Sequence, residues 1–178
     1  MSTPITKAQN KTTIRRVALG ADHRGSEALH QIAQMLRQQA IDTVMCVDRG
    51  GTACDYPDMA FPVCRSIVDG EADLGILACG TGLGSSIAAN KVPGIRAALV
   101  HDEIGAEMSR RCLDANVLCL AADMTGARLL ERIVAMFLGT TFEGGRHERR
   151  LAKVRAIEGG GSPEEVETVA DTADPGGA

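Results

Sequence analysis

The chain has 178 residues, 44% of them hydrophobic, and a formal net charge of −4 at pH 7. This length fits a single domain with a substantial core. Residues 159–178 carry five carboxylates and no Lys or Arg, which leaves the rest of the chain at a net charge of +1. With three Phe, one Tyr and no Trp, this nearly neutral body lacks the basic surface and the aromatic platforms that bind nucleic acids. The composition therefore argues against a nucleic-acid partner.

Six cysteines are spread along the chain without a Cys-x-x-Cys pair. Two of them, Cys46 and Cys119, fall in segments that we predict to be buried strands, so we expect reduced thiols, as in cytoplasmic proteins. No apolar run approaches the length of a membrane span, and the N-terminus has no signal-peptide core. We therefore expect a cytoplasmic protein without a membrane partner.

Predicted strands and helices alternate along the chain. The polar residues 1–14 are expected to form a flexible N-terminus. Apolar runs predict strands at residues 16–20, 43–47, 74–78, 95–100 and 117–120. Apolar periodicity and capping signals predict helices that start near residues 26, 58, 85, 103, 125 and 146. The Gly-, Pro- and acid-rich residues 159–178 predict a disordered acidic tail.

Local signals predict how these helices begin and which side they bury. The first helix carries apolar residues at the spacing of one buried stripe: Leu29, Ile32, Ala33 and Leu36. Asp58 is expected to cap the second helix, and Ser85 or Ser86 the third. In the fourth helix, Ile104 and Met108 are expected to face the core.

Five buried strands that alternate with helices predict an α/β fold. We expect a five-stranded parallel sheet with helices on both faces, in a single three-layer α/β/α Rossmann-like domain over residues 15–158. Ligands of such sheets bind beyond the carboxyl ends of the strands. Six residues with reactive or polar side chains are predicted at this edge: Asp22, His23, Cys79, Thr81, His101 and Asp102.

The stretch Cys79-Gly-Thr-Gly-Leu-Gly, directly after a buried strand, is the strongest candidate for chemistry. Gly80, Gly82 and Gly84 are expected to take positive φ and to turn N–H groups toward Cys79. The resulting positive potential favours a thiolate, so Cys79 is a candidate base or nucleophile. The alternative is a buried core cysteine followed by a tight turn.

Spacing tests three known phosphate-binding loops against this stretch. A cysteine phosphatase loop needs an Arg six residues after its Cys, where this chain has Ser85. A Walker loop needs a Lys that does not follow these glycines. The dinucleotide fingerprint is matched weakly, with Ser85 in place of its third glycine and Asp102 as the ribose-binding acid.

Arg146 and Arg150 lie four residues apart in a basic segment near the C-terminus, so on a helix they share one face. They fit either a solvated helix surface or a clamp for one phosphate group.

Four motifs, in order between residues 16 and 157, resemble those of the ribose-5-phosphate isomerase B and galactose-6-phosphate isomerase family. They are Gly20-Ala-Asp-His, Asp55-Tyr-Pro, Cys79-Gly-Thr-Gly-Leu-Gly with Ile87-Ala-Ala-Asn-Lys, and Glu143-Gly-Gly-Arg-His-x-x-Arg. The resemblance implies an aldose-ketose isomerase of a phosphorylated sugar, by family default ribose 5-phosphate, that works without metal or cofactor. It also implies a homodimer or a dimer of dimers with sites between subunits.

The same resemblance implies roles for single residues. Cys79 is the base that moves a proton from C2 to C1 of the sugar through an enediolate, Thr81 orients it, and the N–H groups of the loop hold the enediolate oxygen. The residues implied to bind the substrate are Asp22, His23, Tyr56, Gly80, Gly82, Leu83, Gly84, Arg146 and Arg150.

Three positions depart from the family pattern. Cys112 stands where the family has the His assigned to ring opening, Leu113 replaces the neighbouring Asn, and Asp123 replaces an Arg that often helps to bind phosphate. His101 is a candidate substitute for the ring-opening residue. The departures leave the sugar open, a tetrose 4-phosphate included. A non-catalytic flavodoxin-like module for a nucleotide or flavin is the alternative from another class.

Overall fold

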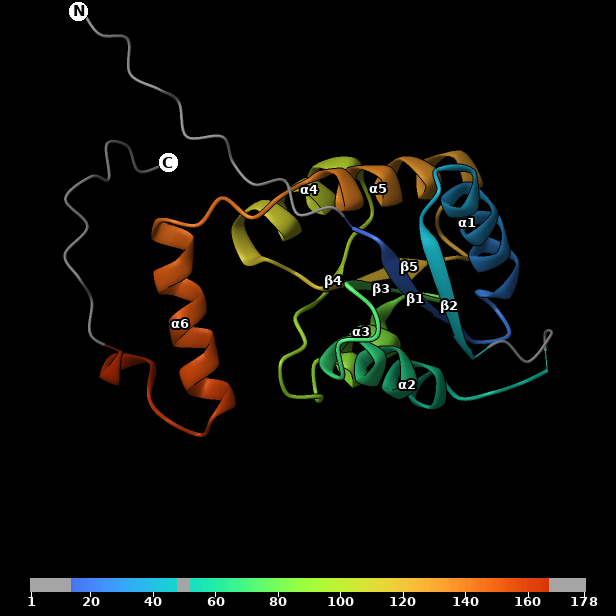
Figure 1. Cartoon of the computed structure of the whole chain (residues 1–178). Coiled ribbons are helices and arrows are strands. Elements are labelled where there is room, and N and C mark those ends of the chain that lie inside the picture. The colour runs from blue at the N-terminus through green and yellow to red at the C-terminus, as the bar shows by residue number, and fades with distance from the viewer. Residues whose placement is uncertain (1–13, 48–51, 167–178) are drawn as a thin grey trace, which may run out of the picture.

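The computed structural model describes residues 14–47 and 52–166, so the predicted flexible N-terminus up to residue 13 and the end of the acidic tail lie outside the described residues. The strands are β1 (Arg16–Ala21), β2 (Asp42–Val47), β3 (Leu74–Cys79), β4 (Ala97–Leu99) and β5 (Val117–Ala121) (Figure 1). The helices are α1 (Ser26–Gln38), α2 (Tyr56–Val68), α3 (Leu83–Ala89), α4 (Glu103–Leu113), α5 (Ala127–Gly139), α6 (Arg146–Glu158) and a 3-10 turn, η1 (Pro163–Glu165).

The strands form one parallel sheet in the order β2-β1-β3-β5-β4. From β1 the chain goes outward to β2, and β3 then lies on the other side of β1, followed by β4 at the far edge and β5 between β3 and β4, so the order switches between β1 and β3. Open parallel sheets hold their ligands at the carboxyl ends of the strands beside such a switch. The predicted fold class is confirmed, and the ends of β1 and β3 are where this fold places a site.

Helices cover both faces of the sheet and bury a core on each (Figure 1). On one face α1, α4 and α5 pack around residues such as Ile76 and Phe137, and on the other α2 and α3 pack around residues such as Leu77 and Met59. Ile76 and Leu77 are neighbours in β3 and point to opposite faces, as the period of a strand requires. The middle of the sheet is therefore rigidly held on both sides.

The predicted buried stripe of α1 is confirmed, because its four residues, Leu29, Ile32, Ala33 and Leu36, are all buried. Two predicted helix starts are wrong. Helix α2 begins at Tyr56, with Asp55 in extended backbone before it and Pro57 in its first turn, where proline's fixed φ suits a helix, so Asp58 already lies inside. Helix α3 begins after Gly82, whose φ of 74° lets the chain turn directly into the helix.

Helix α4 does not bury the residues that its sequence predicts. Ile104 is 73% exposed and Met108 is 40% exposed, while Ala106 and Ser109 are the buried ones. The helix therefore turns its small residues toward the sheet and leaves large apolar side chains exposed.

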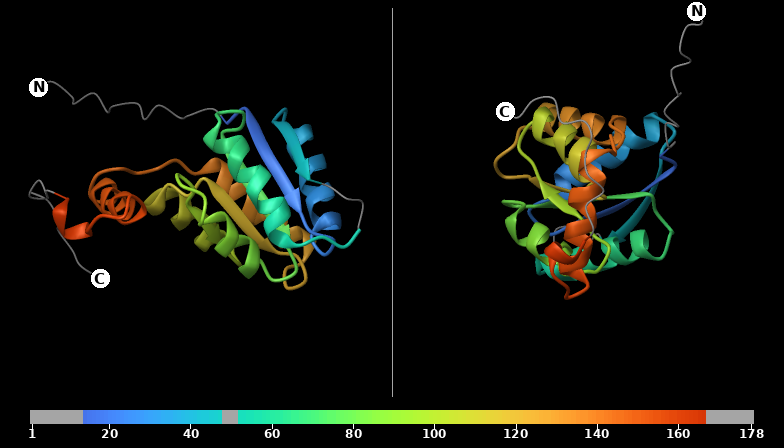
Figure 2. Two further views of the ribbon diagram at one scale, coloured as in Figure 1. Left: turned by 90° about the horizontal axis from the view of Figure 1, so that it is seen from below. Right: turned by 90° about the vertical axis from the view of Figure 1, so that its left-hand side faces the viewer.

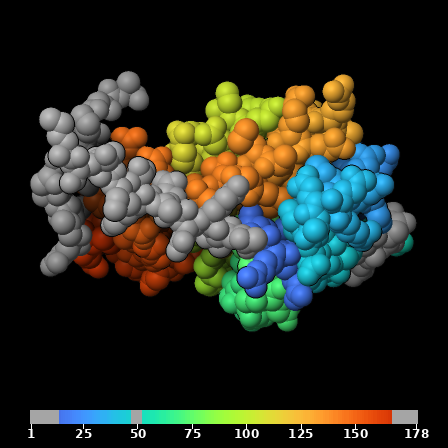
Figure 3. All heavy atoms as spheres, turned by 45° about the horizontal axis from the view of Figure 1, so that its top comes forward, coloured from blue at the N-terminus to red at the C-terminus, as the bar shows by residue number. Residues whose placement is uncertain are grey.

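Helix α6 lies beyond the β4 edge of the sheet, beside the body of the domain (Figures 1 and 2). In the space-filling view it forms a lobe at one end of the molecule (Figure 3). The predicted helix in this basic segment is confirmed. Of the predicted tail, residues 159–166 are described and contain η1, which contacts α6. Within the described residues, none of the helices has the length and apolar character of a membrane span.

Candidate functional site

Asp22 and Cys79 lie side by side at the switch in strand order. Ala21 of β1 is in register with Ala78 of β3, and the N–H of Asp22 donates to the carbonyl of Ala78 at 3.2 Å. Asp22 is almost buried, and its Oδ1 accepts N–H groups of Arg24 and Gly25 at 2.9 and 3.0 Å. These bonds hold the Asp22 carboxylate and the chain around it beside the end of β3.

Cys79 closes β3 with its side chain 4% exposed. Its sulfur accepts the N–H of Gly82 at 3.1 Å and lies 3.3 Å from the hydroxyl oxygen of Ser85. Ser85 is fully buried, and its hydroxyl also reaches the carbonyl of Gly82 at 3.1 Å. The Gly82 N–H and the Ser85 hydroxyl are therefore placed to donate hydrogen bonds to the sulfur. The sequence pattern predicts Ser85 as a helix cap, and no local signal indicates that it neighbours Cys79.

Each of the three loop positions requires glycine for a different reason. Of the three, only Gly82 has a positive φ, of 74°, so the expectation of positive φ at Gly80 and Gly84 is wrong. A Cβ on Gly80 would lie 2.7 Å from Oδ2 of Asp123, and a Cβ on Gly84 would lie 2.8 Å from the ring of Tyr56. Gly80 and Gly84 therefore leave room for side chains that close over the loop.

The remaining residues predicted near this loop lie at its rim. Tyr56, at the start of α2, is 44% exposed and packs its ring against Gly84, as the Gly84 contact shows. His23 is exposed, directly after β1. Thr81 is also exposed, and its hydroxyl oxygen accepts the N–H of Leu83 at 3.4 Å, so the hydroxyl next to the Cys79 sulfur is that of Ser85.

An ion pair between Arg24 and Asp123, which no sequence motif predicts, lies against the other side of the loop. The guanidinium of Arg24 binds Oδ2 of Asp123 through Nε at 2.6 Å and Nη2 at 2.5 Å. Asp123 follows β5, and its N–H donates to the carbonyl of Gly80 at 3.0 Å. The position that departs from the family pattern therefore lies within the site. Its type alone, an acid where an Arg is expected, was the signal that could have suggested a cationic partner.

Two further cysteines share the apolar core beside Cys79, and both are held neutral. Burial raises the pKa of the Cys64 thiol to about 11 and also raises the pKa of Cys119. A thiol below its pKa stays protonated, so at neutral pH neither can act as a base. Among the three, Cys79 is the one whose sulfur accepts a loop N–H, that of Gly82.

Three predicted site residues lie elsewhere in the chain. Cys112 is in the last turn of α4, which leads through residues 114–116 to the amino end of β5. Cys79 is at the carboxyl end of β3, so the two lie at opposite ends of the strands, and a six-residue strand is about 17 Å long. Arg146 and Arg150 belong to α6, which packs on the end of α4 beyond β4 (Figure 2). One chain therefore does not bring these three residues to the Cys79 loop.

His101 and Asp102 follow β4, two strands away from β3. His101 is exposed, and Oδ1 of Asp102 accepts the N–H of Gly105 at 2.6 Å as the N-cap of α4. The weak dinucleotide reading gave Asp102 a ribose, but the structure gives it the ordinary work of a helix cap.

Comparison with known proteins agrees with this geometry. The profile of the ribose/galactose isomerase family matches residues 17–154. Ribose-5-phosphate isomerase B of Escherichia coli is 39% identical over 145 residues, which are 82% of this chain and 97% of that protein. A D-erythrulose-4-phosphate isomerase of Pectobacterium atrosepticum is 37% identical over 143 residues, or 80% of this chain and 94% of the relative.

Solved structures give the same result. The structure of Clostridium thermocellum ribose-5-phosphate isomerase B superposes with a TM-score of 0.80 at 41% identity, covering 82% of this chain and 98% of that one. The chain therefore belongs to the ribose/galactose isomerase family, as the order of its four motifs predicts.

Proposed function

We propose that this isomerase converts a phosphorylated aldose into the corresponding ketose, with Cys79 as the base. The observation that carries this proposal is the position of the Cys79 sulfur. It lies at the end of β3 beside the strand switch, 3.1 Å from the N–H of Gly82 and next to Asp22 at the end of β1. A thiolate placed there faces a ligand bound at the ordinary site of this fold.

The reaction needs one proton to move between neighbouring carbons. The Cys79 thiolate takes the proton from C2, the C2–H electrons form the C1=C2 bond, and the former carbonyl oxygen O1 takes up negative charge as an enediolate. The loop N–H groups stabilise that charge. Cys79 then returns its proton to C1, O2 becomes the carbonyl oxygen, and O2's proton passes to O1. Thr81 is proposed to orient the base through the loop, where its hydroxyl oxygen holds the N–H of Leu83, while Asp22, His23 and Tyr56 hold the hydroxyl groups or the phosphate of the sugar.

We further propose that the site is completed by a second copy of the chain. The proposed site residues fall into two groups: the Cys79 loop with Asp22, His23 and Tyr56, and the α4 to α6 region with Cys112, Arg146 and Arg150. One chain keeps the first group at the carboxyl ends of β1 and β3 and the second group away from them. A two-fold dimer is the simplest arrangement that brings the two groups together. In each site Arg150 and Arg146 of one subunit would bind the phosphate of a sugar held by the Cys79 loop of the other.

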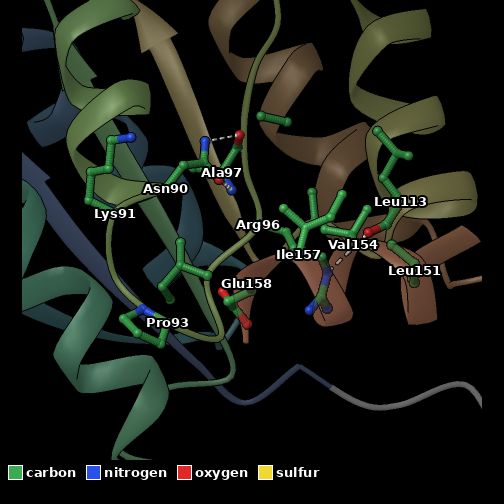
Figure 4. Close-up of a pocket in the computed structure, with 13 residues that line it drawn as sticks. Asn90, Lys91, Pro93, Arg96, Ala97, Leu113, Leu151, Val154, Ile157 and Glu158 are labelled. Carbon is green, nitrogen blue, oxygen red and sulfur yellow. Dashed lines mark hydrogen bonds between the residues drawn. The ribbon is translucent and has the colours of Figure 1, made fainter. Parts of the chain in front are cut away.

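The surface around α6 fits this assembly. A groove of about 500 Å³ lies between α6 and the body at the β4 edge. Leu113, Val154 and Ile157 line it with between 49% and 59% of each residue exposed, and Figure 4 shows Val154 and Ile157 of α6 on the same side as Leu113 of α4. Ile104 and Met108, further along the same helix α4 as Leu113, are also exposed apolar side chains. Burying such a surface in a dimer is favourable.

The substrate is proposed to be ribose 5-phosphate, with ribulose 5-phosphate as the product, and a tetrose 4-phosphate is the second candidate. The Escherichia coli relative and the Clostridium thermocellum structure carry the first name. The Pectobacterium atrosepticum relative, at nearly the same identity, carries the name of a tetrose phosphate isomerase. Cys112, Leu113 and Asp123, which depart from the family pattern, favour testing both.

The decisive experiment assays a panel of aldose phosphates from tetroses to hexoses for ketose formation. Wild-type protein is expected to convert at least one of them, and Cys79→Ala to lose about 10² to 10⁴-fold in kcat while still binding substrate. Cys54→Ala, which changes a half-buried cysteine outside the loop, is the matched control and should retain activity. Wild-type turnover by Cys79→Ala would refute the mechanism, and no ketose from any sugar would refute the function.

A further inference from the structure

We propose that Arg24 is a positioning residue for this reaction: it neutralises the carboxylate of Asp123, which lies against Gly80 beside Cys79. Without that pairing, a fixed negative charge would oppose both the Cys79 thiolate and the enediolate. The inference rests on the proposed function, because it concerns the charge that this function develops at the loop.

The two side chains reach the loop from either side of the strand switch. Arg24 comes from the turn after β1, where its N–H is held by Oδ1 of Asp22 at 2.9 Å. Asp123 comes from the turn after β5, where its N–H is bound to the carbonyl of Gly80 at 3.0 Å. Both backbones are thus anchored, and the guanidinium meets the carboxylate oxygen at 2.5 and 2.6 Å.

The space around Gly80 shows how closely the Arg24–Asp123 pair approaches the loop. An added Cβ would lie 2.7 Å from Oδ2 of Asp123 and 2.8 Å from Nε of Arg24, both inside the contact distance of real Cβ atoms. The ion pair therefore rests directly on the residue that follows Cys79. With 58% and 35% of the two side chains exposed, it is not a pair that adds much to stability. The pair matters because its two charges lie next to the Cys79 loop.

The other titratable groups around Cys79 do not replace Arg24. On the neighbouring elements β1, α2 and β5 with the turns that follow the strands, these groups are Asp22, His23, Arg24, Tyr56, Cys64, Cys119 and Asp123. Cys64 and Cys119 remain neutral, because burial raises the pKa of both. The Asp22 carboxylate is already held by two N–H groups. Asp123 is thus the carboxylate over Gly80, and Arg24 is the cation that offsets it.

The test removes the two charges singly and together. In Arg24→Gln the Asp123 carboxylate is uncompensated, so we expect the rise of kcat/KM with pH to move about one unit upward and kcat/KM at pH 7 to fall about tenfold. Adding Asp123→Asn removes the opposing charge, so the double variant should recover most of the loss. Iodoacetamide alkylation of Cys79, read by peptide mass across pH without substrate, should shift and recover in the same way.

The matched control is Arg65→Gln, which breaks an equally short ion pair of similar exposure between α2 and Asp69, the residue after that helix. It should leave both pH profiles unchanged. The proposal is overturned if Arg24→Gln leaves them unchanged too, if it raises KM alone, or if the double variant is as impaired as Arg24→Gln. Shifted alkylation in a protein that isomerises none of the sugars would support the pairing and refute the proposed function, so the two can fail separately.

Discussion

The hydroxyl oxygen of Ser85 lies 3.3 Å from the sulfur of Cys79, and both side chains are almost fully buried. The same hydroxyl reaches the carbonyl of Gly82, whose N–H is bound to that sulfur. When Cys79 loses its proton, the Ser85 hydroxyl can turn from the carbonyl to the thiolate. A hydrogen bond to a charged group is stronger than one between neutral groups, so the Ser85 hydroxyl can stabilise the sulfur when it carries charge during the reaction.

Ser85→Ala is therefore expected to lower kcat by about tenfold or more while changing KM little, because one bond to a charged sulfur is lost. Steady-state kinetics on the best sugar of the panel measures both constants. Ser86→Ala is the control, since its hydroxyl also bonds a carbonyl of the preceding turn, that of Leu83 at 2.8 Å. An unchanged kcat in Ser85→Ala would show that the serine serves packing alone.

Gly82→Ala tests the backbone of the loop. Gly82 has a φ of 74°, and a Cβ there would lie 2.4 Å from Cδ1 of Leu99 and 3.2 Å from the backbone of Leu120. Strain and overpacking together should lower the free energy of unfolding by about 2 to 4 kcal/mol. Denaturant unfolding measures this loss.

Gly139→Ala provides the comparison for this measurement. It changes a glycine at the end of α5 that has open space around its Cβ position and no positive φ, so its stability should change by about 0.5 kcal/mol or less. Equal stabilities for the two variants would mean that the loop backbone is free to rearrange.

The glycine loop shows how far the sequence could predict the site. Spacing and chain order were sufficient to place Cys79 at a strand end, beside Asp22, because buried strands and strand-end residues have strong local signals. The reasons for Gly80 and Gly84 could not be read locally. They depend on Asp123 and Tyr56, which lie 43 and 28 residues away from them and approach only in the folded chain.

Helix α4 shows the other limit. Its apolar spacing predicts that Ile104 and Met108 are buried, yet both are exposed in the single chain. Apolar periodicity predicts that one face of a helix is buried. It does not indicate whether that face packs against the same chain or against another copy. The same ambiguity applies to the site. The family motifs imply that Cys79, Arg146 and Arg150 belong to one site, but a single chain keeps the two arginines away from Cys79.

A subunit-mixing experiment resolves this ambiguity. Cys79→Ala and Arg150→Ala are each expected to be nearly inactive as homodimers. If a site combines Cys79 of one subunit with Arg150 of the other, a mixed dimer has one intact site. Random mixing in equal amounts should then restore about a quarter of wild-type activity, since half the dimers are mixed and half of their sites are intact. No recovery after verified subunit exchange would place both residues in the same subunit's site.

Arg150→Ala should also raise KM for phosphorylated sugars far more than for the same sugars without phosphate, because a charge-assisted bond to the phosphate is lost. Initial rates on paired sugars give the two ratios. Arg155→Ala changes another exposed arginine of α6, one that pairs with Glu148, and should alter neither. Equal effects on both sugar types would return Arg150 to the role of a solvated surface residue.

Cys112 stands where the family has the His assigned to ring opening. Ribose 5-phosphate is mostly a furanose closed through O4, so its ring must open by proton transfer before Cys79 can reach C2. Imidazole, with an unperturbed pKa of about 6.5, exchanges protons near neutral pH better than a thiol does. A tetrose 4-phosphate carries its phosphate on O4 and cannot close that ring, so it needs no such help.

We therefore expect this isomerase to be relatively better on erythrose 4-phosphate than family members that carry the His. The ratio of kcat/KM for erythrose 4-phosphate and ribose 5-phosphate measures this preference, and Cys112→His with Leu113→Asn should shift it toward ribose 5-phosphate. His101→Ala tests the substitute shuttle, because loss of ribose 5-phosphate activity alone would assign ring opening to His101. If the wild-type protein uses ribose 5-phosphate as well as the Escherichia coli relative does and ignores erythrose 4-phosphate, the ring-opening argument is wrong, and Cys112 is a half-buried residue of α4 with no part in choosing the sugar.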